Sequence, residues 1–312
     1  MIFNITPNLI SSILAIIGVL IFFQVLAQIL SFVKKDKDFS NLKIRLKSWW
    51  LIISFIAFIL LFKSPVNYIF TGILCFLALR EFFGFLDISE NDKPLRFWAY
   101  LTIPIEMYFL YIGWLAMFYL FVPLYMFMFI PIRKIFSGKT ENFIKSSGTI
   151  QWGLVLTVYS LGYVGAFLLL PFNTKYSLNG AELLLFLLIL NSMNDGFQYI
   201  WGKLFGKNKI VPHISPNKTW EGFIGGVLTT VVISVIAAPH LTPMNPIMAV
   251  CAGLMISVFG FLGDVVMSAV KRDVGVKDSS HLIPGHGGIL DRVDSLIFTA
   301  PLFFHFICYF FK

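Results

Sequence analysis

The residues of this chain that could do chemistry are concentrated between Ser268 and Asp294, in the string SAVKRDVGVKDSSHLIPGHGGILDRVD. The string combines acids, bases, two histidines and a Gly-rich turn, and it lies between two apolar segments of membrane-spanning length. Counted from residue 264, it holds five carboxylates (Asp264, Asp273, Asp278, Asp291 and Asp294) and four cations (Lys271, Arg272, Lys277 and Arg292). Cations alone would suffice to orient a membrane loop. The mixture indicates a site that binds both a metal ion and phosphate groups.

Transfer of a phosphoryl or nucleotidyl group between two anions is the chemistry that suits this mixture. Negative charge must be neutralised before the groups can approach, and the protein supplies little covalent chemistry. Carboxylates favour Mg²⁺, which bridges phosphate oxygens, so Asp264 and Asp291 are the predicted metal ligands. Asp294, one turn after Asp291, is expected to support the metal site or a second cation. The other residues predicted to act in catalysis are Lys271, Arg272, Lys277, Asp278, His286 and Arg292.

Several polar residues lie within apolar segments, where charge is expensive. A charged side chain near the middle of a bilayer costs at least about 2.5–3.5 kcal/mol. Two sets have helical spacing and so share a helix face each: Asn191, Asn194, Asp195 and Gln198, and Asp264, Ser268, Lys271 and Arg272. Substrate binding is predicted for Asn194, Asp195 and Ser268, although hydrogen bonds between helices would also explain the first set. Glu106, beside Pro104, has no polar neighbours, which favours a structural or snorkelling role.

Two turns that precede predicted helices could each bind an anion, because free N–H groups and the helix dipole attract phosphate there. The first extends from residue 202 to 222, and the residues in it predicted to contact substrate are Lys207, Ser215, Asn217, Lys218 and Thr219. An ordinary helix capped by Ser215 or Thr219 explains part of the same pattern. The second turn is 284–288, where glycines let N–H groups converge. Substrate contacts are predicted there for Gly287 and Gly288.

The elements that must position these residues are apolar helices. The chain is 58% hydrophobic and 13% charged, whereas a soluble domain averages roughly 25% charged residues. A bilayer core requires about 20 apolar residues per helix. We therefore predict an all-α, polytopic bundle of about ten membrane spans, at residues 9–33, 48–62, 65–83, 97–112, 114–132, 150–171, 181–201, 222–239, 247–267 and 295–311. Gly113 is the predicted turn between the fourth and fifth spans.

Composition also divides the chain. Residues 1–175 are interpreted as N-terminal membrane helices, and residues 176–312 as a C-terminal catalytic half that holds nearly all the unusual polar residues.

The three cysteines, Cys75, Cys251 and Cys308, each lie inside an apolar run. Packing is therefore favoured for them over a disulfide framework or a zinc site.

Lys and Arg residues fall on alternate connections between the predicted spans. With the N-terminus outside, all but three of the 24 face the cytoplasm, in connections 34–47, 80–96, 133–145, 203–218 and 271–292. Because basic loops stay inside, we predict a multi-pass protein of the cell (inner) membrane with its active site on the cytoplasmic face. The net charge of +8 then needs no nucleic-acid partner to explain it.

The string 268–294 resembles the signature of the phosphatidate cytidylyltransferases (CDP-diacylglycerol synthases). The matching positions are Ser268, Lys271, Arg272, Lys277, Asp278, Pro284, His286, Gly287, Gly288, Asp291, Arg292 and Asp294. Upstream, Asn194-Asp195, Gly202 to Lys207 and Ser215 to Gly222 resemble the family's nucleotide-binding half. The resemblance covers residues 190–312, whereas the first half matches only as a bundle of spans. It departs at Gln198, where family members more often have alanine.

The resemblance implies transfer of CMP from CTP to phosphatidic acid, with release of pyrophosphate. It also implies Mg²⁺ together with K⁺, a homodimer in the bilayer, and Asp264 and Asp291 as metal ligands. One alternative is a related CTP-dependent lipid kinase, or a cytidylyltransferase with another lipid phosphate as acceptor. Another is an anion or metal transporter that uses Asp195 and Asp264, although transporters usually place such groups near mid-bilayer on broken helices.

Overall fold

The computed structural model describes residues 3, 6–33, 40–86, 93–136, 142–170, 179–280, 282–284 and 287–311. Regular structure in these residues is helical, apart from three isolated bridging pairs, so the predicted all-α class is confirmed. The first half contains α1 (Pro7–Val33), α2 (Ser40–Leu61), α3 (Val66–Phe85), α4 (Lys93–Tyr111), α5 (Leu115–Leu120), η2 (Phe121–Met126), α6 (Phe127–Ile135), α7 (Phe143–Gly153), η3 (Leu154–Tyr159) and α8 (Ser160–Phe167). The second contains α9 (Gly180–Phe205), α10 (Trp220–Leu241), α11 (Pro246–Asp273) and α12 (Leu290–Phe311).

Eight helical segments in the described part of the chain are long and apolar enough to cross a membrane: Pro7–Ile29, Val66–Phe85, Leu115–Ile135, Phe143–Phe167, Gly180–Phe205, Trp220–Leu241, Pro246–Asp273 and Leu290–Phe311. The chain is therefore a polytopic integral membrane protein. The other two predicted spans coincide with α4 and with α2, whose apolar part is Leu46–Leu61. Because α2 already begins at Ser40, part of the first basic connection is helix rather than loop.

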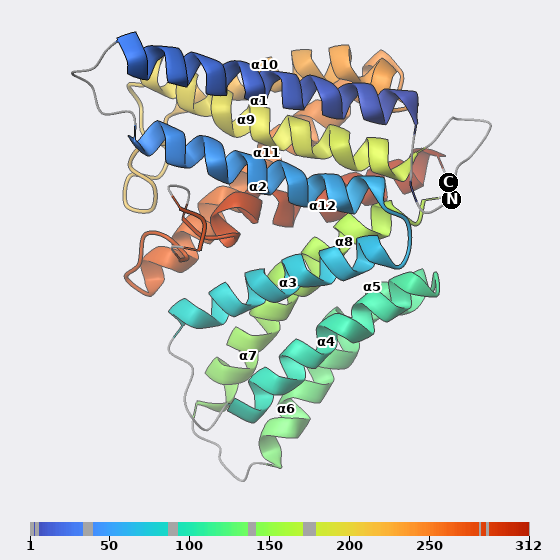
Figure 1. Ribbon diagram of the computed structural model, residues 1–312. Coiled ribbons are helices and arrows are strands. Elements are labelled where there is room, and N and C mark those ends of the chain that lie inside the picture. Colours follow the sequence, from blue (N-terminus) through green and yellow to red (C-terminus); the bar gives the residue numbers. More distant parts are fainter. Residues whose placement is uncertain are drawn as a thin grey trace.

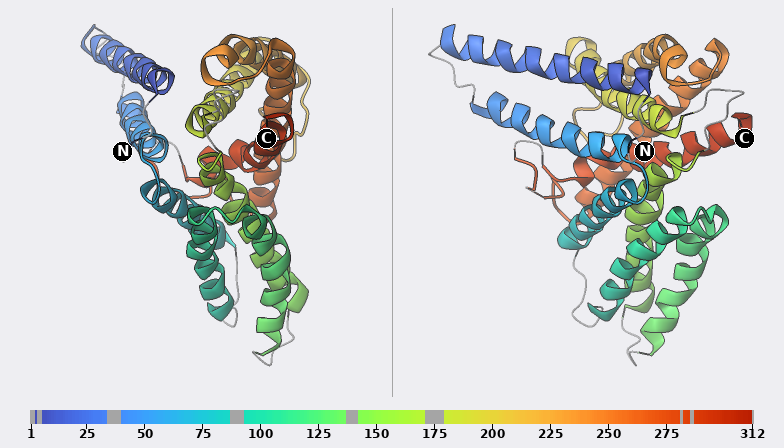
Figure 2. Two further views of the ribbon diagram at one scale, coloured as in Figure 1. Left: turned by 90° about the vertical axis from the view of Figure 1, so that its right-hand side faces the viewer. Right: turned by 45° about the vertical axis from the view of Figure 1, so that its right-hand side comes forward.

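The helix ends divide between two sides of the molecule, as Figures 1 and 2 show. The ends of α1, α3, α6, α9 and α11 and the starts of α2, α4, α7, α10 and α12 lie toward the left and lower left of Figure 1. The α2–α3, α4–α5 and α10–α11 connections lie on the opposite side. The first group of helix ends flanks the five predicted basic connections, and we call this side the basic side.

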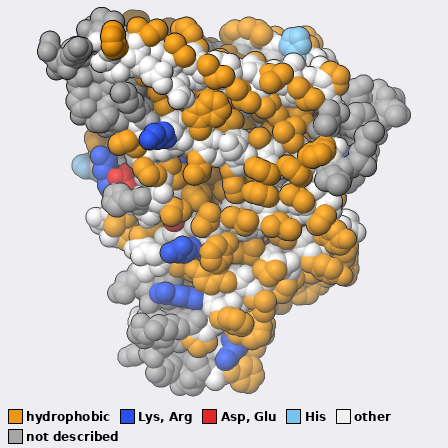
Figure 3. Space-filling view, viewed as in Figure 1, with side chains coloured by type: hydrophobic (Ala, Val, Ile, Leu, Met, Phe, Trp, Pro, Cys, Tyr) orange, Lys and Arg blue, Asp and Glu red, His pale blue; other side chains and the backbone are white. Residues whose placement is uncertain are grey.

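Side chains on the molecular surface follow the same division. On the face drawn in Figure 3, hydrophobic side chains cover most of the surface, whereas Lys and Arg lie toward the left and lower left. Large apolar side chains of α1 are well exposed, including Leu14 (60%) and Phe22 (62%). A soluble protein rarely exposes so large a continuous apolar surface, so these side chains are expected to face lipid.

Breaks and starts of helices occur where the sequence supplies a physical reason. Gly113 separates α4 from α5 with φ +74°, a left-handed conformation that suits glycine, and the predicted turn is confirmed. Pro123 lies in the π-helical segment η2, because proline lacks the N–H of a regular helical turn. Helices α9, α10 and α11 are preceded by the N-cap residues Asn179, Thr219 and Asn245, whose side chains each accept a hydrogen bond from an N–H of the first turn.

Small residues let the helices of the second half approach closely. Helix α10 packs on α9 and α11, and α11 packs on α12. A Cβ at Gly226 of α10 would overlap Gln198 of α9, and a Cβ at Gly263 of α11 would overlap the carbonyl oxygen of Asp294 on α12. Helix α12 also packs on α8 and α3, so both halves contribute to one apolar core. Close packing thus brings the polar ends of α9, α11 and α12 together.

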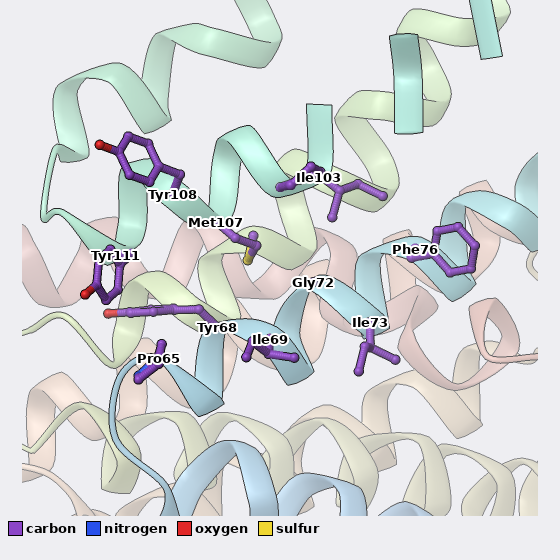
Figure 4. Close-up of a pocket in the computed structure, with 11 residues that line it drawn as sticks. Pro65, Tyr68, Ile69, Gly72, Ile73, Phe76, Ile103, Met107, Tyr108 and Tyr111 are labelled. Atoms are coloured by element: carbon purple, nitrogen blue, oxygen red, sulfur yellow. The ribbon is translucent and has the colours of Figure 1, made fainter. Parts of the chain in front are cut away.

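An apolar hollow of about 410 Å³ lies between α3 and α4 (Figure 4). Its lining includes Tyr68, Gly72, Ile103 and Met107, which belong to the ends of these helices farther from the basic side. No charged side chain is among the residues that line it. Its lining therefore offers no cation to pair with a phosphate group, and the polar site lies elsewhere.

Candidate functional site

Helices α11 and α12 meet at the basic side with polar residues on the two surfaces in contact. On α11, Asp264, Ser268 and Lys271 share one face, and on α12 Asp291 and Asp294 share another. The helices run in opposite directions because their connecting loop lies at the basic side. Lys271 therefore pairs with Asp291 close to the loop. Asp264 lies deeper, within range of the charge of Asp294.

The carboxylate of Asp291 organises the loop that precedes α12. Its Oδ1 accepts a bond from Lys271 Nζ at 2.6 Å. Its Oδ2 accepts three bonds, from Ser279 N and Ser279 Oγ, both at 3.0 Å, and from Gly288 N at 2.9 Å. The side chains of Asp291 and Lys271 are only 8% and 10% exposed, so this ion pair is shielded from solvent. Gly287 has φ +78° beside the same carboxylate, a conformation that favours glycine.

Asp264 is the centre of a second ion pair, which joins α11 to the loop before α10. Its Oδ2 accepts a bond from Lys218 Nζ, and its Oδ1 accepts one from Ser268 Oγ at 3.2 Å. The ammonium group of Lys218 also lies 4.6 Å from the centre of the Phe261 ring, a distance at which a cation is attracted to the aromatic face. The Asp264 side chain remains 28% exposed, so a ligand can reach it.

Asp195 of α9 and Asp294 of α12 complete a group of three carboxylates with Asp264. Their charges act on one another, which is unfavourable for like charges at close range. Ser295 Oγ lies 3.3 and 3.2 Å from the two Asp195 oxygens, and Ser295 N donates to Asp294 Oδ1 at 2.8 Å. In the described residues the ion pairs found are Lys218–Asp264 and Lys271–Asp291. The group therefore supplies carboxylate oxygens outside these two ion pairs, on Asp195 and Asp294, to which a cation could bind.

The donor chemistry of these carboxylates fits Mg²⁺ when the substrate supplies the remaining ligands. Across the described part of the chain, no three His, Cys, Asp or Glu side chains are arranged to hold a metal ion by themselves. Mg²⁺ commonly uses one or two carboxylates, with waters and substrate phosphates completing its shell. Asp264 suits this role, and Asp195 and Asp294 lie beside it. At Asp291, Oδ2 already accepts three bonds and Oδ1 accepts one from Lys271, so a metal ion could bind this carboxylate only by displacing Lys271 from Oδ1.

The loop before α10 is held at both ends. The carboxylate of Glu221 accepts bonds from Lys207 N at 3.1 Å and from Asn208 N and Nδ2 at 3.2 and 2.7 Å. Thr219 Oγ1 accepts a bond from Gly222 N at 3.2 Å, so the interpretation of Thr219 as an N-cap is confirmed. Lys207 and Asn217 are exposed and Ser215 is partly exposed. These side chains, together with Lys218, can reach a ligand at the basic side.

The other predicted catalytic residues lie around the same loops. Lys277, Asp278 and Arg292 are exposed. Arg272 donates to the carbonyl oxygens of Ile214 at 3.2 Å and Val276 at 3.0 Å, so it ties the end of α11 to the loop before α10. His286 and His281 lie outside the described residues.

Asn194 and Asn191 connect helices instead of facing open space. Asn194 is fully buried; its Nδ2 donates to Ser257 O at 3.2 Å, and its Oδ1 accepts from Thr230 Oγ1 at 3.3 Å. Asn191 Nδ2 donates to Thr299 Oγ1 at 2.8 Å. For these two residues the structure shows the alternative of hydrogen bonds between helices. On the same helix, Asp195 is exposed.

Glu81 of α3 is a site residue that the sequence analysis missed. Its Oε1 accepts from Ser280 Oγ at 2.6 Å and Ile289 N at 2.9 Å, and its Oε2 accepts from Ser279 Oγ at 3.1 Å and Leu290 N at 2.9 Å. The N–H groups of Ile289 and Leu290, which follow the predicted anion-binding turn 284–288, therefore bind a carboxylate of the chain itself. In the sequence, the only sign of this role is a charged residue near the end of an apolar helix.

Comparison with known proteins assigns this arrangement to a family. The model of the Cytidylyltransferase family matches residues 43–310. The chain belongs to this family. The resemblance inferred from residues 190–312 is thereby confirmed, and the match extends through most of the first half as well.

Relatives within the cytidylyltransferase family differ in how much of the chain they match. The chain is 42% identical over 276 residues to the uncharacterized protein YnbB of Escherichia coli (strain K12), across 88% of this chain and 90% of that protein. It is 42% identical over 144 residues to a phosphatidate cytidylyltransferase of Staphylococcus epidermidis and 41% identical over 145 residues to one of Staphylococcus aureus. Each of these two matches covers 46% of this chain and 55% of the relative. The chain thus spans about half the length of those two enzymes.

Proposed function

We propose that this protein transfers CMP from CTP to phosphatidic acid, forming CDP-diacylglycerol and pyrophosphate. The observation that carries the proposal is the meeting of Asp195, Asp264 and Asp294 with Lys218 and Lys271 at one side of a membrane bundle. This arrangement suits two anionic substrates that must approach each other. Membership of the cytidylyltransferase family and the partial matches to phosphatidate cytidylyltransferases support the nucleotide and the lipid.

The reaction needs charge neutralisation and alignment more than covalent help. A phosphate oxygen of phosphatidic acid attacks the α-phosphorus of CTP and forms a new P–O bond. The bond from that phosphorus to the oxygen bridging to the β-phosphate breaks, and pyrophosphate leaves with the electron pair. Lys218 and Lys271 stabilise the developing charge by exchanging a carboxylate partner for phosphate oxygens. Exposed Lys207, Lys277 and Arg292 attract the triphosphate toward the site.

The proposed metal is Mg²⁺ at Asp264, with Asp195, Asp294 or Oδ1 of Asp291 as the second carboxylate. When bound, it would polarise phosphate oxygens and neutralise their charge. The spare carboxylates of the same group would suit a second cation, for which K⁺ is proposed. Asp264 lies between Lys218 and Ser268, so these two residues keep its carboxylate oriented toward the ligand.

The site is proposed to face the cytoplasm, where CTP is present, from an inner (plasma) membrane crossed by ten helices. Cysteine substitutions on a background without native cysteines test this orientation. A cysteine at Gly113 should react with an impermeant reagent added to intact cells, whereas one at Thr140 should react only after permeabilisation. The reverse pattern would place the basic side outside and remove the access of CTP.

A cytidylyltransferase with a different lipid phosphate acceptor is the second candidate function. It is favoured by one observation: the uncharacterized E. coli protein is matched along nearly its whole length, whereas the two phosphatidate cytidylyltransferases named above are matched along about half of theirs. The chemistry at the α-phosphorus would be unchanged. Only the groups that contact the lipid would differ.

One assay separates these functions. The purified protein is incubated in detergent with Mg²⁺ and CTP labelled in the α-phosphate, and either phosphatidic acid or a polyprenyl phosphate is added. Label in an extracted CDP-lipid identifies the transferase and its acceptor. Label transferred only from the γ-phosphate, in a parallel reaction, would show a lipid kinase and refute the proposal. Chemical cross-linking of the same sample tests the proposed homodimer.

A further inference from the structure

Ser279 connects the carboxylate of Asp291 to a carboxylate of the first half of the chain. Its Oγ lies 3.0 Å from Asp291 Oδ2 and 3.1 Å from Glu81 Oε2. Its backbone N–H donates to Asp291 Oδ2 at 3.0 Å. A hydroxyl group has one proton to donate, so the two carboxylates compete for the same donor. A displacement of Glu81 would therefore change the hydrogen bonds of Asp291 through Ser279 alone.

The loop before α12 is shaped around Glu81. A Cβ at Gly288 would overlap both Ser279 Oγ and the Glu81 carboxylate, so the chain can pass over Glu81 only with glycine at this position. Ser48 of α2 donates a hydrogen bond to Pro284 O at 2.7 Å. Two helices of the first half thus hold the same loop, and Glu81 makes the larger number of bonds.

A carboxylate suits this position for an electrostatic reason. The first N–H groups of a helix have no partner within it, and the helix dipole favours a negative charge there. Glu81 supplies both the acceptors and the charge to Ile289 and Leu290. It is buried, with 6% of its surface exposed, so solvent cannot replace it. Glutamine would turn an N–H₂ group toward two of the four donors.

We propose that Glu81 is a positioning residue for the active site. It fixes residues 279–280 and 289–290 so that Asp291 stays opposite Lys271, and it thereby makes α3 a part of the catalytic structure. The inference rests on the proposed function for its kinetic test, but its structural test is independent of any activity. The first half of the chain then helps to position the active-site residues, in addition to embedding the protein in the membrane.

Three purified variants test the proposal. Glu81→Gln removes acceptors from the loop, and Ser279→Ala removes only the shared hydroxyl. Glu182→Gln is the matched control: Glu182 is also buried (7%), and its Oε1 accepts a bond from Thr6 Oγ1 at 2.5 Å, at the start of α9 on the side opposite the basic side. Each variant is assayed for kcat and for KM with CTP. The rate of trypsin cleavage after the exposed Lys277 is measured on the same samples without substrates.

Glu81→Gln should lower kcat about 100-fold, the effect of a small misplacement of reacting groups. Its KM for CTP should stay within about threefold of wild type, because uniform substrate binding is unaffected. Cleavage after Lys277 should be several-fold faster. Ser279→Ala should change kcat and cleavage in the same directions by smaller factors. Glu182→Gln should match wild type in both measurements.

The proposal is overturned if Glu81→Gln keeps more than about a tenth of the wild-type kcat with unchanged cleavage after Lys277. An equal loss of kcat in Glu182→Gln would also overturn it, since any buried carboxylate would then serve. If Glu81→Gln does not fold, Ser279→Ala decides in its place, and wild-type kcat and cleavage in that variant would overturn the proposal. If the wild-type protein transfers CMP to no lipid, the proposed function fails, and the cleavage rates alone decide the role of Glu81.

Discussion

Replacing Asp291 by asparagine should leave Lys271 as a buried, unpaired cation. Asparagine keeps a carbonyl oxygen for the N–H groups of Ser279 and Gly288, but its charge is gone. The Lys271 side chain is only 10% exposed, so water can do little to solvate it. Removing one partner of such a pair costs about 3–5 kcal/mol. The variant should therefore lose about that much free energy of unfolding, together with its activity.

A double variant that combines Asp291→Asn with Lys271→Met tests whether the unpaired cation causes this loss. Removing both charges abolishes the buried unpaired cation, and such replacements are often close to neutral. The double variant should therefore regain most of the lost free energy of unfolding, with a coupling of at least about 2 kcal/mol. Its activity should stay at least about 100-fold below wild type, because neither charge is then available for catalysis.

Unfolding in mixed detergent and SDS micelles, followed by tryptophan fluorescence, measures these free energies. Asp273→Asn is the matched control, since Asp273 is an exposed aspartate at the end of α11, the helix that carries Lys271. It should change stability by less than about 0.5 kcal/mol. The reasoning is refuted if Asp291→Asn is as stable as the control. It is refuted equally if the effects of the two single changes simply add.

Three further predictions concern other parts of the structure. Lys218→Ala should raise KM for CTP by at least about tenfold with a smaller effect on kcat, because Lys218 reaches Asp264 from the loop before α10. An unchanged KM in steady-state kinetics would show that the nucleotide binds elsewhere. Asn194→Ala should lower the free energy of unfolding by about 1–3 kcal/mol, because it removes buried hydrogen bonds to two other helices, and KM for CTP should stay constant. A change in KM without a loss of stability would instead show that Asn194 contacts the substrate. Glu106→Met should stabilise the fold by about 1–3 kcal/mol, because Glu106 is fully buried and neither carboxylate oxygen has a hydrogen-bond partner in the described residues. A loss of stability on unfolding in SDS would contradict this prediction.

Much of the architecture could be predicted because it depends on local composition. Hydropathy located the helices, and the spacing of Lys and Arg predicted which connections share a side. The turn at Gly113 and the N-cap at Thr219 also followed from local chemistry. The start of α2 did not, because basic residues in its first turns resemble a loop sequence. Helix propensity and membrane embedding are different properties, and hydropathy reports only the second.

The details of the site could be predicted only in part, for a geometric reason. Periodicity places Asn191, Asn194 and Asp195 near one face of a helix, but it does not say which neighbour covers each residue. Asn194 is covered by α10 and α11, whereas Asp195 is not. Glu81 posed a harder problem, since its partners are distant in sequence and nothing near it is unusual. Contacts of that kind require the tertiary structure.

The bond between Glu81 and the start of α12 has a consequence for biosynthesis. The donor Ile289 follows Glu81 by 208 residues, so α3 emerges from the ribosome long before its partner exists. Until α12 inserts, the Glu81 carboxylate lacks the N–H groups and hydroxyls that satisfy it. The site therefore closes only when α12 has inserted. A nascent chain that stops before α12 carries an unsatisfied acidic group in its membrane domain, a feature by which quality-control machinery could distinguish it from the finished protein.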